Sequence, residues 1–404
     1  MPSLGMTKYK RGKMNYRILG KTGLSVSEIG FGGEWLERHE EQESIELIRY
    51  AESKGINIID CWMPDPKSRD IIGKAIAGSR EKWYVQGHIG STYQNGQYVR
   101  ARDLEHVIPA FEDQLRRIGG GYIDLGMIHY IDSETDWENS MNSEFIDYVL
   151  DLHDQGIIRH IGMSTHNPRM AIRAIRNGLH GYKDPSRTAE LEMVLFSINP
   201  AFDMRPGTNC VEELFTGYEE GYSGVDPERA EFYRLAEEKN VGITVMKGFF
   251  GGALLDVSRS PFGVAFTPAQ CIHYALTRPG ARSILVGYDT KEQIDEAISY
   301  ETASDEEKDF ASVIANAPKH SYKGTCTYCG HCRPCVMNID IAMVNKFYDL
   351  ASKQPEVPES IQAHYEALGI TAASCIGCRD CESRCPFEVP IAERMEKALA
   401  LFGC

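Results

Sequence analysis

Two tight runs of cysteines near the C-terminus carry the clearest chemical signal in the sequence. They read CTYCGHCRPC and CIGCRDCESRCP, and their thiols are Cys326, Cys329, Cys332, Cys335, Cys375, Cys378, Cys381 and Cys385. The second run has the C-x2-C-x2-C-x3-C-P spacing of bacterial ferredoxins. The first has a shorter last gap, and Val336 replaces the proline. Thiolates at two-residue gaps can wrap an iron–sulfur cubane, so the sequence predicts two [4Fe-4S] clusters.

The last cysteine of each run is expected to cross over to the other cluster, as it does in two-cluster ferredoxins. One cluster then uses Cys326, Cys329, Cys332 and Cys385, and the other uses Cys375, Cys378, Cys381 and Cys335. Structural zinc favours C-x2-C pairs separated by a longer loop, and disulfide frameworks belong to small secreted chains. The alternative that stays open is a structural role for a cluster in place of electron transfer.

Short apolar segments alternate with longer amphipathic ones before these runs, and they must position any further site. Eight segments rich in Ile and Val are typical of parallel strands buried on both faces: 26–33, 56–60, 83–88, 122–129, 157–164, 192–197, 242–247 and 283–287. Helical spacing separates them, for example over 44–55 and 144–156. Eight such units predict an α/β fold, a (β/α)8 TIM barrel. A doubly wound sheet is the alternative, but no G-x-G-x-x-G follows the first strand.

The domain boundaries follow from the same patterns. We expect a disordered tail over 1–13, the barrel over 14–300, a linker over 301–324, and a small α-helical, ferredoxin-like iron–sulfur domain over 325–404. The segment between the two cysteine runs predicts two helices around a proline-marked turn.

Composition narrows the function classes. The chain of 404 residues has a formal net charge of −15, which argues against nucleic acid or an anionic membrane surface as a partner. No apolar stretch approaches the length of a membrane-spanning helix, and no secretory signal is evident. Oxygen-labile clusters and reduced thiols predict a cytoplasmic protein.

The ends of the predicted strands hold a second candidate site, because functional residues of such barrels lie at the C-terminal strand ends. Asp60 closes an otherwise apolar strand, where an unpaired carboxylate would be costly to bury. His88 and His129 close two further strands. A single histidine there is more often structural, but together with Asp60 these residues favour a functional site.

Several segments together resemble one family. They are YRILGKTGLSVSEIGFGG, Asp60 followed by SRDIIGKAI, YIDLGMIH, IGMSTHNP and EQIDEAI. The chain resembles the aldo-keto reductase superfamily, in particular its bacterial branch with a C-terminal ferredoxin-like extension. The resemblance implies a catalytic Asp, Tyr, Lys and His, of which Tyr protonates the substrate carbonyl while a nicotinamide supplies hydride. By position Asp60 and His129 match, whereas Asp65 stands for the Tyr and His88 for the Lys. Proton handling would then fall to His88 and Asp65.

The nicotinamide site implied by the resemblance is altered as well. Ile198 stands nearest to the position of a stacking Tyr, and Asp289 stands where an Arg would grip the 2′-phosphate of NADP. Thr165 replaces an amide-binding Asn. The candidate cofactor-binding residues are Ser164, Thr165, Lys247, Gly251 and Gly287.

Three functions remain open at this point. The first is an iron–sulfur oxidoreductase that reduces a small organic substrate in the barrel, with electrons passed through the clusters from a donor such as an external ferredoxin. The second is an NAD(P)H-dependent carbonyl reductase with structural clusters. The third is a metal-dependent barrel enzyme that uses the His and carboxylate groups, or a non-catalytic binding module. The altered nicotinamide contacts favour the first. The sequence shows no flavin motif and settles neither the substrate nor the oligomeric state.

Overall fold

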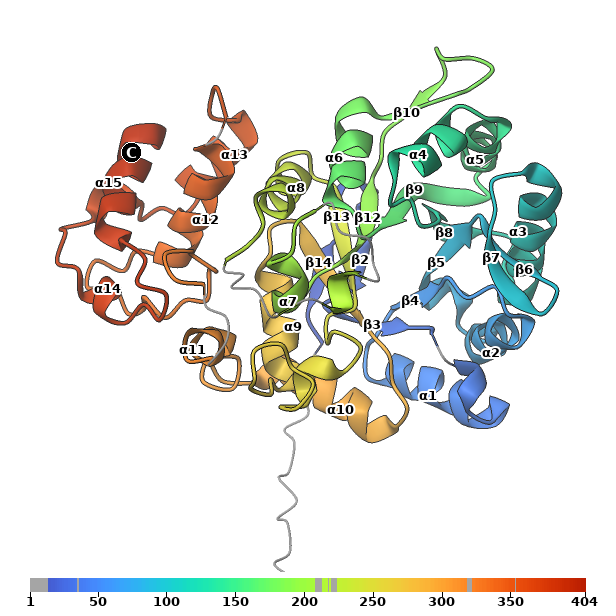
Figure 1. The fold of residues 1–404 in the computed structure, drawn as a ribbon, viewed down its shortest axis with the longest axis horizontal. Helices are drawn as coiled ribbons and strands as arrows, with labels where there is room; N and C mark the ends of the chain where they lie inside the picture. The colour runs from blue at the N-terminus through green and yellow to red at the C-terminus, as the bar shows by residue number, and fades with distance from the viewer. Residues whose placement is uncertain are drawn as a thin grey trace, which may run out of the picture.

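A computed structural model describes residues 14–404, apart from 35, 208–212, 217, 219–223, 318–321 and 353. The expected tail, residues 1–13, lies outside this range. The described chain forms a barrel and a smaller helical unit beside it (Figure 1).

Eight parallel strands close the barrel in the order β12-β13-β14-β3-β4-β5-β8-β9. They are β3 (Ile29–Gly32), β4 (Ile58–Cys61), β5 (Tyr84–Ile89), β8 (Ile123–Ile128), β9 (Ile158–Thr165), β12 (Met193–Ser197), β13 (Gly242–Met246) and β14 (Ala281–Val286). All residues of β4, β8 and β12 are buried, as expected for parallel strands covered on both faces. The predicted strands and the (β/α)8 barrel are confirmed.

Helices surround this barrel (Figure 1). They are α1 (Glu41–Ser53), α2 (Pro66–Ile76), α3 (Leu104–Ile118), α4 (Glu134–Met141), α5 (Glu144–Asp154), α6 (Pro168–Asn177), α7 (Pro200–Asp203), α8 (Pro227–Glu238), α9 (Pro268–Thr277) and α10 (Lys291–Ser299). An antiparallel pair, β1 (Tyr16–Ile18) and β2 (Ser25–Ser27), precedes the barrel strands. Leu19, directly after β1, and Val26 on β2 pack against apolar side chains of the barrel strands, among them Leu125.

A hairpin that the strand pattern had not indicated follows β5 directly. Its strands β6 (Ser91–Gln94) and β7 (Gln97–Arg100) are antiparallel, and Tyr93 lies opposite Tyr98. Asn95 and Gly96 form the turn with φ values of 51° and 79°, as a two-residue Asn-Gly hairpin turn requires. Since it follows the C-terminal end of a barrel strand, the hairpin lies on the rim where sites of this fold are built.

The C-terminal part is helical. Outside this C-terminal part, directly after α6, the short strands β10 (Leu179–His180) and β11 (Thr188–Ala189) form an antiparallel pair. The region expected as a linker contains α11 (Phe310–Ala315), whose Phe310 and Ile314 are buried. Beyond it lie α12 (Ile341–Ala351), α13 (Glu359–Glu366), α14 (Asp380–Ser383) and α15 (Ile391–Phe402). The two helices expected between the cysteine runs are α12 and α13.

Specific contacts fix this helical unit to the barrel. Arg278 donates to the backbone oxygen of Thr327 at 2.6 Å, and Lys346 on α12 pairs with Glu237 on α8 at 3.3 Å. Tyr322 donates to the backbone oxygen of Pro200 at 2.6 Å. The contacts place the cysteine-rich unit beside α8 and α9 (Figure 1).

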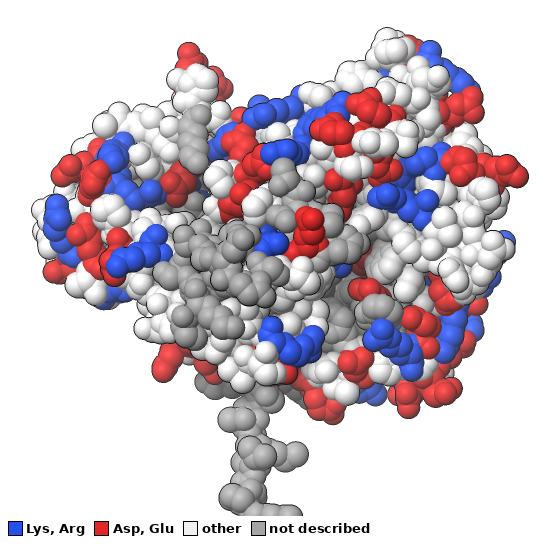
Figure 2. Space-filling view, in the orientation of Figure 1, with Lys and Arg blue, Asp and Glu red and all other residues white. Residues whose placement is uncertain are grey.

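On the face shown in Figure 2, Lys and Arg are interspersed with Asp and Glu. Among the described helices, none combines the length and the hydropathy that a membrane span requires.

Candidate active site and cysteine sites

Three of the four predicted catalytic residues form one chain of hydrogen bonds across neighbouring strand ends. Nε2 of His88 lies 2.9 Å from Oδ1 of Asp60, and Nδ1 of His88 lies 2.8 Å from Nδ1 of His129. The three side chains come from β4, from β5 and from the residue after β8, which are neighbours in the barrel. They are 5%, 2% and 5% exposed.

The hydrogen-bond partners set the direction of donation in this chain. Asp60 Oδ1 also accepts from Nε2 of Gln86 at 3.0 Å, and a carboxylate only accepts, so the proton of His88 on Nε2 faces Asp60. One proton is shared between the two Nδ1 atoms. Burial holds the pKa of His129 well below its usual value, and the nearby His88 and Arg102 lower it further. An additional proton on the histidine pair is therefore better stabilised on His88, in contact with Asp60.

Tyr98 extends the chain, and sequence reasoning missed it. Its hydroxyl lies 2.8 Å from Nε2 of His129. The Trp62 ring stacks on His129 at 6.0 Å with an interplanar angle of 7° and meets Tyr98 edge-on at 5.4 Å. The signal that could have found Tyr98 is the Asn95-Gly96 turn, which predicts a hairpin over this segment.

Asp65 lies outside this chain. Its side chain accepts from the backbone nitrogen of Ser68 at 3.1 Å and caps α2, and it is also hydrogen-bonded to Tyr93. An Asp followed by Pro at the start of a helix is a common cap arrangement. The structure therefore gives Asp65 a structural task, and its proton-handling role stays a prediction.

Two of the predicted cofactor-binding side chains are engaged with the loop after β8. Ser164 accepts at Oγ from the backbone nitrogen of Tyr130 at 2.8 Å, and Thr165 donates to Asp132 at 2.9 Å. Thr165 is fully buried. Both side chains thus shape the rim of the barrel beside His129.

The other predicted cofactor residues lie in loops at the same ends of β13 and β14. Lys247 follows β13 and adopts a φ of 57°. Its charge lowers the pKa of Glu34, although burial dominates and raises that pKa overall. Gly251 has a φ of 62°, a region that favours glycine. A Cβ on Gly287 would meet open space, so that backbone is accessible.

The two positions with altered nicotinamide contacts behave differently in the structure. Ile198 is fully buried and offers no aromatic face. Asp289 is exposed and its carboxylate lies 3.0 Å from Nε2 of His39. At both positions the side chain differs in chemistry from the one that the resemblance implies.

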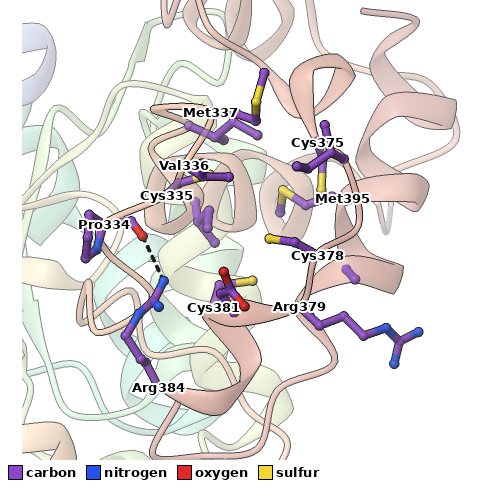
Figure 3. A pocket seen from close by; sticks show the side chains of 15 residues that line it. Pro334, Cys335, Val336, Met337, Cys375, Cys378, Arg379, Cys381, Arg384 and Met395 are labelled. Atoms are coloured by element: carbon purple, nitrogen blue, oxygen red, sulfur yellow. Dashed lines mark hydrogen bonds between the residues drawn. The ribbon is translucent and has the colours of Figure 1, made fainter.

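The two cysteine runs line two separate cavities, each with four thiols. Cys326, Cys329 and Cys332 share one cavity with Cys385. Figure 3 shows the other, in which Cys375, Cys378 and Cys381 surround a space with Cys335. In each cavity three thiols come from one run and the fourth from the other. The structure thus brings together the same sets of four that the ferredoxin spacing predicts.

The walls of both cavities are largely apolar. Apolar side chains such as Phe387, Val389 and Ile391 line the first cavity, and Val336, Met337 and Met395 line the second. All eight cysteines are thiols rather than disulfides. Within the described part of the chain, no three His, Cys, Asp or Glu side chains converge closely enough to hold one metal ion. Cluster binding by these thiols therefore stays a prediction from their spacing.

The fold and the strand-end residues can now be compared with known proteins. Residues 28–200 match the aldo/keto reductase family. The chain is 30% identical over 191 residues to aldo-keto reductase YhdN of Bacillus subtilis, which covers 45% of this chain and 56% of YhdN. It is 28% identical over 332 residues to versiconal hemiacetal acetate reductase of Aspergillus parasiticus, and that alignment covers 71% of this chain and 92% of the relative. Alignment with YhdN thus spans little more than half of that relative.

A solved structure agrees with the barrel. Aldo-keto reductase AKR11C1 of Bacillus halodurans, in its holo form, superposes with a TM-score of 0.53 at 20% identity and covers 73% of this chain and 94% of its own. At that identity the likeness concerns the fold. Aldo/keto reductase homologues are oxidoreductases, in agreement with the enzyme class expected from the sequence.

Proposed function

We propose that this chain is an iron–sulfur oxidoreductase whose aldo/keto reductase-type barrel reduces the carbonyl group of a small organic substrate. The observation that carries the proposal is the buried Asp60–His88–His129 chain, joined by contacts of 2.9 and 2.8 Å at the barrel's rim. Such a chain can hold and deliver a proton, and carbonyl reduction requires one at the substrate oxygen. The divergent tetrad therefore keeps acid–base chemistry with different residues.

The cysteine-rich unit, residues 325–404, is proposed to hold two [4Fe-4S] clusters that supply the electrons. The cavity with Cys326 lies next to the barrel, because Arg278 bonds the neighbouring Thr327. The other cavity includes Cys378, which is exposed. Each cluster carries one electron, so the two together match the two electrons that one carbonyl needs. An external ferredoxin or a similar one-electron donor would reduce the exposed cluster.

The remaining assignments belong to the same proposal. Residues 14–300 form the catalytic domain and 301–324 connect it to the cluster domain. Clusters and reduced thiols suit the cytoplasm.

A second candidate is an NAD(P)H-dependent carbonyl reductase with structural clusters. It is favoured by the position of the cluster unit. Helix α12 packs against α8, which follows β12, and β12 lies four strands away from β4 around the barrel. The clusters would then lie across the barrel from Asp60. Against this candidate stand Ile198 and Asp289, which offer neither a stacking ring nor a phosphate-binding charge.

Anaerobic purification followed by metal analysis and turnover assays tests the proposal. We expect about eight iron and eight sulfide per chain, and reduction of aldehyde probes with reduced methyl viologen as the electron source. A colourless zinc protein would contradict the clusters. Turnover with NADH alone, unchanged in a Cys378→Ser variant that has lost a cluster, would favour the second candidate.

A further inference from the structure

We propose that Tyr98 donates the proton to the carbonyl oxygen of the substrate, with His129 and His88 as the relay behind it; this inference rests on the proposed function. The hydroxyl of Tyr98 lies 2.8 Å from Nε2 of His129. Tyr98 is 39% exposed, whereas His129 and His88 are 5% and 2% exposed. Of the hydrogen-bonded chain that begins at Asp60, Tyr98 is thus the most exposed member.

Tyr98 lies on β7, and the hairpin β6–β7 positions its phenol beside His129. The resemblance puts a tyrosine at the position of Asp65, in the loop after β4, and this chain has none there. Tyr98 arrives instead from the loop after the neighbouring strand β5. Trp62 meets it edge-on at 5.4 Å while stacking on His129, so the rings of Tyr98 and His129 are both held against one indole.

The proton steps balance along the printed contacts. With one additional proton on the histidine pair, His88 donates from Nε2 to Asp60 and from Nδ1 to His129, and His129 donates from Nε2 to the Tyr98 oxygen. The phenolic O–H bond then breaks and its proton bonds to the substrate oxygen. Tyr98 regains a proton from His129, and His129 regains one from His88. In the cluster-driven reaction both electrons reach the substrate one at a time from the external one-electron donor through the clusters, and a second proton, taken from solvent, bonds to the carbonyl carbon.

The surroundings of Tyr98 raise its pKa overall, so its hydroxyl keeps the proton that it is proposed to donate. Burial raises the pKa of Tyr98, and Arg100 and Arg102 act in the opposite direction, while Asp136 and Asp132 raise it. Arg102 also donates to the backbone oxygen of His129 at 2.6 Å, which fixes that residue. His166, Arg100 and Arg102 all oppose a positive charge on His129. A proton that reaches His129 is therefore passed on toward Tyr98 rather than retained.

The test compares Tyr98→Phe with two matched variants of the full, cluster-loaded protein. Tyr182→Phe removes an exposed hydroxyl from the segment between β10 and β11, and Tyr93→Phe removes the one bonded to Asp65. Benzaldehyde and glyceraldehyde serve as probes, with reduced methyl viologen or NADH as reductant. We expect kcat to fall by about a hundredfold or more in Tyr98→Phe, with little change in KM, and wild-type rates in Tyr182→Phe.

A second readout needs no substrate. The ¹⁵N resonances of the His129 imidazole report the bond at Nε2, so they should shift in Tyr98→Phe and stay unchanged in Tyr182→Phe. Wild-type turnover in Tyr98→Phe, an equal loss in Tyr93→Phe, or unchanged His129 resonances would each overturn the inference. If the wild-type protein reduces neither probe, the proposed function fails first, and this inference fails with it.

Discussion

Replacing Asp60 with Asn removes one negative charge from the site and little else. In the structure, Oδ1 of Asp60 accepts both from Gln86 at 3.0 Å and from His88 at 2.9 Å. An Asn can keep its carbonyl oxygen at the same place, so both contacts persist as neutral hydrogen bonds. Hydrogen bonds to a charged group contribute about 1.5–3 kcal/mol and neutral ones about 0.5–1.5 kcal/mol. The expected loss is about 1 kcal/mol for each bond, or about 2 kcal/mol in total.

That loss falls on the state in which His88 carries an additional proton, because Asp60 is its counter-charge. About 2 kcal/mol corresponds to roughly a thirtyfold decrease in kcat. Asp65→Asn is the matched control, since Asn caps a helix as well as Asp does, and the charge is removed five positions along the chain. The assay is steady-state reduction of an aldehyde probe, together with chemical unfolding of both variants. Unchanged turnover in Asp60→Asn, or a larger loss in Asp65→Asn, would refute the reasoning.

Three further predictions concern protonation and cluster ligation. Burial, with Lys308 and Arg17, lowers the pKa of His273 to about 4. The unfolded chain therefore binds the proton more readily between pH 6.5 and 4, and the free energy of unfolding should fall by about 2 kcal/mol from pH 7 to 5. In urea unfolding, His273→Gln should flatten this pH dependence, whereas His180→Gln, at an exposed position, should not. Burial and Glu28 raise the pKa of Glu301 to about 7. The stability that its neutral form contributes is therefore lost as the pH rises from 4.5 through 7. Glu301→Gln should unfold at a higher urea concentration than the wild type at pH 8, but not at pH 5. Cys385→Ala should disturb the cluster of the first run, seen as a loss of that cluster's signal in electron paramagnetic resonance, and a loss confined to the second run's cluster would contradict the crossed ligation.

The barrel and the grouping of the cysteines around two cavities could be predicted because their signals are local and repetitive. Strands such as β4 and β8 are buried at every position and mostly apolar, which is the pattern of parallel strands covered on both faces. The cysteine spacing likewise indicated the grouping of the thiols, because Cys335 and Cys385 each line the cavity of the other run. Crossed ligation of two clusters stays a prediction.

The rest of the candidate site depended on backbone geometry that periodicity does not encode. Asp65 occupies the expected position in the sequence, but the proline after it starts α2 and turns its side chain into a cap. Tyr98 lies in a polar segment without strand periodicity, and the Asn95-Gly96 turn alone indicated the hairpin. Glu34 follows a glycine-rich strand end, and its place beside Lys247 and Asp60 depends on closure of the barrel.

The most direct test of the account is whether electrons held by the clusters reach a substrate in the barrel. The protein is reduced anaerobically with dithionite, freed of the excess, and mixed with an aldehyde probe while the visible absorbance of the clusters is followed. We expect the absorbance to recover on mixing as alcohol forms, and the recovery to slow strongly in His88→Ala with both clusters intact. Clusters that stay reduced in the presence of the aldehyde, while NADH supports its reduction, would contradict the account.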